Sequence, residues 1–181
     1  MLFRSVAAVF TAEDGGYWLH RVKYLTHDPA RADVDEATQL CRQVAAFVRD
    51  LHLPAVTLET NGIGRFLPGL LRRELAAQGT PCAVVEQAST RSKDQRIVDA
   101  FDAVLAAGAL YAHRSVWATP FVAEMREWRP GGKARDDGLD AVAGCLLSQP
   151  VRLGRPNVPL SERRDWRPGG GGLKAETEFE I

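Results

Sequence analysis

Apolar and polar residues alternate near the start of the chain, and the alternation predicts a β-hairpin. A short apolar run over 5–10 is followed by a glycine-containing turn, and residues 17–24 then alternate between the two classes. A strict period of two would place Val22 on one face of the second strand and Leu19 on the opposite face. We therefore expect a hairpin with one face wetter than the other.

Later segments carry apolar residues at helical spacing. The first predicts a helix that has Asp33 as its N-cap and ends near His52, before a proline. Three more helices are expected over 66–79, 92–108 and 120–128, with Ser92 and Pro120 as start signals and Gly79 and Gly108 as stop signals.

Short apolar runs between these helices predict further strands, over 55–59, 81–86 and 110–112. The first run is β-branched and apolar, which indicates a central strand that is buried on both faces. It delivers Glu59 at its carboxyl end, where sites form in α/β sheets. A solvated strand end is the alternative explanation of this glutamate.

An acidic segment opens the last predicted helix. Asp136, Asp137 and Asp140 precede an apolar stretch that ends at Leu147, and in a helix Asp137 and Asp140 lie on one face as i and i+3 neighbours. Acidic residues also suit a helix N-terminus, where the helix dipole favours negative charge. On this segment alone, a divalent metal site and simple capping explain the aspartates equally well.

Basic residues gather near two of these helix starts. Arg91, Lys93 and Arg96 surround the predicted N-terminus of the helix 92–108, where cations oppose the helix dipole, so they suggest a phosphate-binding patch. A solvated helix end explains them about as well. Lys133 and Arg135 lie in the basic segment before the acidic helix and join the candidate DNA-binding residues.

Composition adds limits to this picture. The 181 residues are 45% hydrophobic, enough for one domain, which we place at 1–150. Basic and acidic residues number 23 each, so the zero net charge gives no overall attraction to nucleic acid. The cysteines are far apart, which indicates reduced core thiols: Cys41, Cys82 and Cys145. We expect a cytoplasmic protein, because no apolar segment is long enough to cross a membrane.

The composition changes after Pro150 to arginine, proline and glycine, with four successive glycines at 169–172. Such a segment buries too little apolar surface to offset its ordering entropy, so 151–181 is expected to be a flexible C-terminal tail. It is either a docking segment or a segment without function of its own.

The order of these elements predicts an α/β fold with a mixed central sheet flanked by helices. In such a fold Glu59 and the aspartates of the last helix could meet although they are far apart in the sequence. Carboxylates without paired histidine or cysteine favour Mg²⁺ or Mn²⁺ over zinc. Two such ions would support in-line attack on a phosphodiester. A carboxylate pair for glycoside hydrolysis is less well supported, because no polar aromatic cleft is visible.

Three segments in this order resemble the consecutive motifs of a known family: Val56 to Gly64 (VTLETNGIG), Lys93 to Ile97 (KDQRI) and Lys133 to Ala141 (KARDDGLDA). They resemble the nuclease domain of tailed-phage terminase large subunits, and the resemblance covers roughly Ser5 to Gln149. That family is RNase H-like and uses two metal ions to cut concatemeric viral DNA during packaging. The resemblance implies an RNase H-like fold for this chain.

The resemblance also implies site residues and partners. Glu59 matches the family's second acidic ligand, Asp137 matches its late acidic position, and Asp140 is the second carboxylate of that helix. Asp136 remains open as a ligand, although the i, i+3 spacing to Asp140 favours Asp137. The implied cofactor is Mg²⁺ or Mn²⁺, and the implied partners are double-stranded DNA, the portal or procapsid and the small terminase subunit, with no membrane.

One departure from the family concerns its first metal ligand. That ligand is an aspartate on a first strand, which precedes the strand that 5–10 resembles, and the sequence begins after it. The ATP-binding motor domain is not in the sequence either. Glu13 and Asp14 lie in the expected hairpin turn and do not replace the aspartate. We therefore expect an N-terminally truncated domain that binds metal weakly and cuts DNA poorly.

Two other functions stay open. A Holliday-junction resolvase of the same superfamily would keep the i, i+3 aspartates and would prefer branched over linear DNA. A packaging module without catalysis would dock to the portal or procapsid through the tail.

Overall fold

The β-structure forms two sheets in the residues that the computed structural model describes, which are 4–60, 66–148 and 151–152. The larger sheet has the order β5-β2-β1-β6, with β1 and β2 antiparallel and both outer strands parallel to their neighbours. Its strands are β1 (Ser5–Thr11), β2 (Tyr17–Tyr24), β5 (Leu110–Ala112) and β6 (Val151–Arg152). The smaller sheet pairs β3 (Ala55–Glu59) with β4 (Ala83–Gln87) in parallel.

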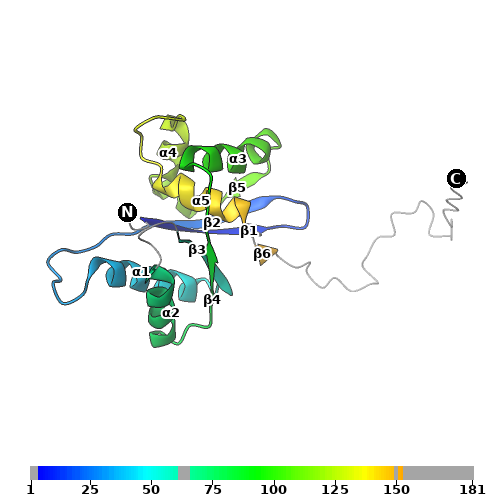
Figure 1. The fold of residues 1–181 in the computed structure, drawn as a ribbon. Coiled ribbons are helices and arrows are strands. Elements are labelled where there is room, and N and C mark those ends of the chain that lie inside the picture. Colours follow the sequence, from blue (N-terminus) through cyan, green and yellow to red (C-terminus); the bar gives the residue numbers. More distant parts are fainter. Residues whose placement is uncertain (1–3, 61–65, 149–150, 153–181) are drawn as a thin grey trace, which may run out of the picture.

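Helices flank both sheets, so the predicted mixed α/β class is confirmed (Figure 1). In Figure 1, α3, α4 and α5 lie on one side of the hairpin, and α1 and α2 lie on the other side with the smaller sheet. The helices are α1 (Glu36–Asp50), α2 (Leu67–Ala77), α3 (Lys93–Ala106), α4 (Phe121–Glu127) and α5 (Asp137–Leu147), with a short 3-10 helix over Arg114–Ala118.

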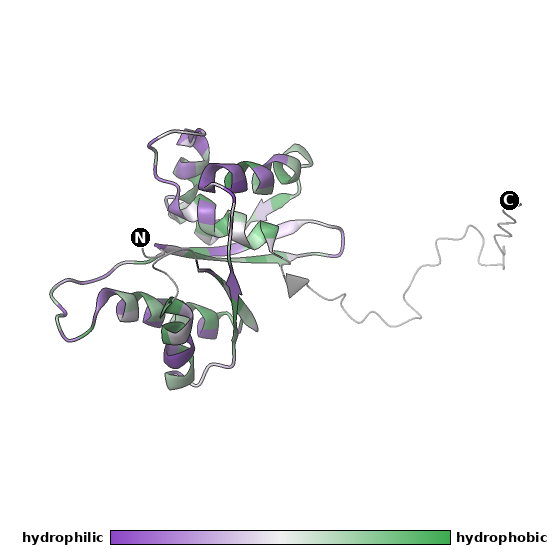
Figure 2. Ribbon diagram, viewed as in Figure 1, coloured by the Kyte–Doolittle hydropathy of each residue, from purple (hydrophilic) through white to green (hydrophobic). Residues whose placement is uncertain are grey.

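Each side of the hairpin has its own hydrophobic cluster. The first joins β1 and β2 to α3, α4 and α5, with Leu19, Phe121 and Val142 among its most buried residues. The second joins α1 and α2 to β3, and Val6 of β1 packs against it. In Figure 2 the helices on both sides of the hairpin alternate between apolar and hydrophilic residues, as expected of helices with one buried face. Full burial of one such side chain stabilises the fold by about 1.5–3 kcal/mol.

The hairpin is confirmed, but its strict alternation is wrong. The pairing shifts from Ala8 opposite Arg21 to Val9 opposite Leu19, which leaves His20 as the extra residue of a β-bulge. The bulge reverses the alternation between the residues before and after His20. Leu19 and Val22 therefore lie on the same face and are both buried in the first cluster. Sequence periodicity does not reveal where a bulge breaks the period.

The N-cap of α1 is Asp35, so the prediction of Asp33 was wrong. The Oδ1 atom of Asp35 accepts a hydrogen bond from the Thr38 backbone N–H at 2.9 Å, and its Oδ2 atom accepts one from Thr38 Oγ1 at 2.7 Å. Both aspartates suit a cap, and the threonine three residues later favours Asp35. The helix ends at Asp50, and His52 has a left-handed φ of 50°.

The other helix signals were correct. The Ser92 hydroxyl caps α3 by accepting a hydrogen bond from the Gln95 N–H at 3.2 Å. Gly79 and Gly108 follow the ends of α2 and α3 with φ of 62° and 61°, the left-handed backbone that favours glycine at a helix stop. Pro120 precedes α4, whose Phe121 is buried.

The strand β3 is more exposed than predicted. In β3 only Leu58 is buried, and Thr57 and Glu59 are exposed. The expectation of a strand buried on both faces was wrong, because β3 pairs with β4 in a separate sheet that α1 and α2 pack against. Within the part of the chain that the structure describes, Glu59 therefore ends a strand whose side chains are mostly exposed or half-buried.

Several remaining expectations concern the edges of the described chain and its cysteines. Val151–Arg152, the start of the predicted tail, forms β6 beside Phe10 and Thr11, and 153–181 lies outside the described residues. The three cysteines are free thiols, as expected, and burial raises the pKa of Cys41 and Cys145 to about 12. Across the described ranges, no helix is long and apolar enough to cross a membrane.

Candidate functional site

Glu59 and Asp140 meet at one guanidinium group. Glu59 ends β3, Asp140 lies in the first turn of α5, and Arg96 lies in the first turn of α3. Arg96 donates a hydrogen bond from Nη1 to Glu59 Oε2, and another from Nη2 to Asp140 Oδ1 at 2.8 Å. The arginine side chain is only 15% exposed. Three elements far apart in the sequence thus converge on one charged group.

Lys93 extends this arrangement to a third carboxylate. Its Nζ atom lies 2.7 Å from Asp136 Oδ1 and 3.9 Å from Asp140 Oδ2. We refer to Glu59, Lys93, Arg96, Asp136 and Asp140 together as the carboxylate–cation cluster. It contains three acidic and two basic side chains, so each cation stands between carboxylates.

Burial sets the electrostatics of the cluster. Burial raises the pKa of Asp140 above its usual value, while the nearby charges of Lys93 and Arg96 act in the opposite direction. The negative charges of Glu59 and Asp136 add to the upward shift. The Nε atom of Arg96 is buried and has no hydrogen-bond partner among the described residues. The cluster therefore holds its charges in mutual contact, with Arg96 at its buried side and Glu59 and Lys93 at its exposed side.

Asp137 lies outside the cluster. Its Oδ2 atom is 3.3 Å from the Nε atom of Arg135, and its backbone oxygen accepts a hydrogen bond from Ser5 Oγ at 2.5 Å. The sequence favoured Asp137 over Asp136 because Asp137 is three residues from Asp140. In the structure it is Asp136 that shares a cation with Asp140.

Glu124 holds the start of α5, the helix that carries Asp140, and it was not predicted from the sequence. This residue of α4 is 4% exposed, and its Oε2 atom accepts hydrogen bonds from the N–H groups of Gly138 at 2.8 Å and Leu139 at 3.2 Å. Its carboxylate therefore caps α5 and satisfies two N–H groups that a helix start leaves free. Its helical spacing from the inward-facing Phe121 and Trp128 could have revealed it.

Tyr24 and Gly138 fix how close α5 comes to the hairpin. A Cβ atom at Gly138 would collide with the Tyr24 hydroxyl and with Glu124 Oε2, so this position accepts only glycine without movement. The Arg135 guanidinium stacks over the Tyr24 ring at 4.6 Å. Burial, followed by the charge of Glu124, raises the pKa of Tyr24 above its usual value.

The predicted DNA-binding residues have different surroundings. Lys93 and Arg96 belong to the cluster, and Arg91 pairs with Asp99 at 2.6 Å. Arg135 pairs with Glu124 and Asp137, with its Nε atom 3.5 Å from Glu124 Oε1. The Lys133 side chain is exposed. Most of these cations are thus bound to carboxylates of the protein itself.

The donor set of the cluster suits a hard divalent cation. Its acidic side chains offer carboxylate oxygens, the ligands that Mg²⁺ and Mn²⁺ prefer. Among the described residues, however, no three acidic, histidine or cysteine side chains are already arranged around a common point. Lys93 and Arg96 occupy the space between the carboxylates and supply the positive charge there.

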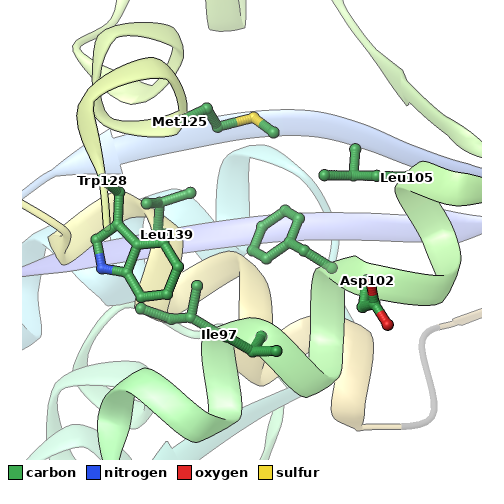
Figure 3. A pocket seen from close by; sticks show the side chains of 8 residues that line it. Ile97, Asp102, Leu105, Met125, Trp128 and Leu139 are labelled. Carbon is green, nitrogen blue, oxygen red and sulfur yellow. The ribbon is translucent and has the colours of Figure 1, made fainter. Parts of the chain in front are cut away.

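A separate hollow of about 230 Å³ lies between α3, α4 and α5 (Figure 3). Its lining is mostly apolar and includes none of the cluster residues: Ile97, Asp102, Leu105, Met125, Trp128 and Leu139 are among the side chains around it. Charged chemistry therefore belongs to the cluster and not to this hollow.

Comparison with known proteins does not place the chain in a family. Neither the models of protein families nor the sequences of curated proteins gave a match to it.

Proposed function

We propose that this chain is an RNase H-like, metal-dependent DNA endonuclease domain, similar to the nuclease domain of tailed-phage terminase large subunits. The observation that carries the proposal is the meeting of Glu59 and Asp140 at Arg96. The resemblance implies both acids as metal ligands, and neither the strand β3 nor the helix α5 brings them together by itself. An ordinary surface ion pair needs only two neighbouring side chains. This contact requires the end of β3 and the start of α5 to lie side by side.

The proposed chemistry is hydrolysis of a phosphodiester bond. Glu59, Asp140 and Asp136 would hold Mg²⁺ or Mn²⁺, which when bound activates water and stabilises the leaving oxygen. Asp136 replaces Asp137 as the preferred third ligand, because it lies beside Asp140. Glu124 and Gly138 fix the start of α5, and thereby the position of Asp140, behind the ligands.

The arrangement of the sheets supports the RNase H-like part of the proposal. Among the described residues β3 pairs only with β4, while Val6 of β1 packs on the same hydrophobic cluster as Val56 and Leu58 of β3. The two sheets therefore share one hydrophobic cluster, which agrees with the mixed α/β core that the resemblance implies.

The proposed biological role is cleavage of concatemeric viral DNA during genome packaging. Double-stranded DNA would be the substrate, and the portal or procapsid and the small terminase subunit would be partners, as in the family that the motifs resemble. This role rests on the resemblance, and the site geometry supports only its chemical part.

The test is cleavage of supercoiled plasmid with Mg²⁺ or Mn²⁺ at high protein concentration. We expect slow nicking that depends on the divalent ion and falls by at least about tenfold in Glu59→Gln and in Asp140→Asn, because each removes a charged ligand. Glu86→Gln, which alters an exposed ion pair with Arg72, is the matched control and should cleave like the wild type.

Three outcomes separate the alternatives. Cleavage that survives both cluster substitutions would come from a contaminant or another site and would reject the proposal. A chain that neither binds Mn²⁺ nor cleaves would leave the packaging module without catalysis as the better function. Preference for a four-way junction over linear duplex would favour the resolvase.

A further inference from the structure

Lys93 and Arg96 stand at an unfavourable place for cations. Both lie in the first turn of α3, where the helix dipole repels positive charge. The structure supplies a local reason for them, because carboxylates from β3 and α5 face this turn. Their partners are the same three acids that the proposed function assigns to metal binding.

We propose that Lys93 and Arg96 are exchangeable counter-ions of the carboxylate–cation cluster. A divalent cation and these two side chains compete for the same carboxylates, and entry of the cation releases the two side chains to bind phosphate groups of DNA. The inference rests on the proposed function, and it adds that metal binding and DNA binding at this site strengthen one another.

Competition follows from the contacts of Arg96. Its Nη1 and Nη2 atoms use one oxygen each of Glu59 and Asp140. A Mg²⁺ or Mn²⁺ ion needs ligand oxygens at about 2.0–2.2 Å, which leaves no room for a guanidinium between the same two carboxylates. Arg96 therefore moves out of its present position when the carboxylates bind an ion.

Charge balance gives the same result for Lys93. Three carboxylates face two cations in the cluster, and a divalent ion supplies the same charge as Lys93 and Arg96 together. The Lys93 side chain is 36% exposed, so its ammonium group reaches water by rotation alone. Arg96, which is more buried, is expected to control the exchange.

The released side chains suit a phosphate group. A guanidinium binds two phosphate oxygens at once, and a lysine adds a compact positive charge beside it. Both remain attached to the first turn of α3, next to the carboxylates that hold the ion. Because the two binding events share these side chains, linkage requires that each raises the affinity of the other by the same factor.

The first test measures binding of Mn²⁺ alone to the full chain by titration calorimetry. We expect Arg96→Gln to bind Mn²⁺ about tenfold tighter than the wild type, because the ion no longer has to displace a charge-assisted contact. Lys93→Gln should shift the affinity in the same direction by a smaller factor. Arg72→Gln breaks the exposed pair with Glu86 and should not change Mn²⁺ affinity.

The second test measures binding of a fluorescein-labelled DNA duplex by anisotropy, in EDTA. Asp140→Asn removes the charge that holds Arg96, so it should strengthen metal-free DNA binding by about fivefold, the effect of one added phosphate contact. Glu86→Gln removes one negative charge elsewhere, and its effect should be clearly smaller. The double variant Asp140→Asn, Arg96→Gln should lose the gain.

The outcomes separate this inference from the function on which it rests. Wild-type binding of Mn²⁺ that weakens or stays equal in Arg96→Gln would overturn the exchange and leave the proposed function standing. No Mn²⁺ binding by the wild type or by either variant would reject both. Melting curves show whether Arg96→Gln is folded, and Lys93→Gln decides the question if it is not.

Discussion

Glu124 and Gly138 are joined by a buried hydrogen bond, in which the Gly138 N–H donates to Glu124 Oε2 at 2.8 Å. The bond connects α4 to the first turn of α5, and Leu139 donates a second one to the same oxygen. It fixes the helix that carries Asp140 without using any of the cluster carboxylates. The support of the site and its chemistry are thus carried by different acidic residues.

Loss of the Glu124 carboxylate should weaken the fold. Glu124→Ala leaves two buried N–H groups without their partner, while Arg135 keeps Asp137, and we expect the free energy of unfolding to fall by about 2–4 kcal/mol. Urea denaturation measures the change. Glu127→Ala, an exposed position on the same helix, should change stability by less than about 0.5 kcal/mol. Equal effects of the two substitutions would contradict the capping role.

Gly138 should tolerate no larger residue. Gly138→Ala places a methyl group against the Tyr24 hydroxyl, and we expect a loss of about 1–3 kcal/mol in thermal or urea unfolding. Gly144→Ala is the matched control on the same helix, because its added methyl group meets no atom within 4 Å. That substitution should stabilise the helix by up to about 1 kcal/mol.

Removal of the Tyr24 hydroxyl should relieve part of this collision. The double variant Gly138→Ala, Tyr24→Phe is therefore expected to be less destabilised than the sum of its two single variants. Additive effects would show that the added methyl group collides with atoms other than the Tyr24 hydroxyl.

The Tyr24 hydroxyl should lose its proton at a higher pH than an ordinary tyrosine side chain. Its raised pKa means that the folded state holds the proton more tightly than the unfolded chain. The resulting stability is complete below about pH 10, the usual tyrosine pKa, and declines as the pH rises toward the folded value. The ultraviolet absorbance of phenolate should show a late step that is absent in Tyr24→Phe.

The control for this titration is the protein in urea, where all three tyrosines should titrate together. Relative to Tyr24→Phe, the wild type should lose stability above about pH 10. If the step that Tyr24→Phe removes lies near pH 10, the usual tyrosine value, the assignment is contradicted.

Lys133 should contribute to DNA binding through charge alone. It is exposed in the basic segment before α5, so Lys133→Gln is expected to lower duplex affinity and to reduce the salt dependence of log K by about 1. Arg49→Gln, on α1 and paired with Asp50, is the control. An unchanged salt slope in Lys133→Gln would remove this residue from the interface.

Local sequence signals predicted most of the secondary structure. Ser92, Gly79 and Gly108 act within one or two turns of the chain, so their effect on helix ends depends little on the rest of the molecule. The errors came where several local solutions were possible. Asp33 and Asp35 both suit a cap, and the bulge at His20 depends on how β1 pairs with β2.

The candidate site likewise combines residues that the sequence predicted with contacts that only the structure shows. Glu59 and Asp140 followed from strand and helix patterns and from the motifs, whereas their common contact with Arg96 required three elements to be packed together. Arg96 was expected to be a DNA-binding residue, and only its distance to two carboxylates identifies it as their counter-ion. The spacing of Glu124 from Phe121 and Trp128 marks it as inward-facing, but only the packing of α4 against α5 shows that it caps α5.

By itself the sequence determined most of the elements, their order, the mixed α/β class and the acidic residues at the end of β3 and the start of α5. These follow from periodicity and from capping chemistry, which act over a few residues. Only the tertiary structure decided that β3 and β4 form a separate sheet and that Asp136, not Asp137, lies beside Asp140. The reason is that long-range packing sets the rotation and depth of each element, and a shift of one residue changes which side chains meet.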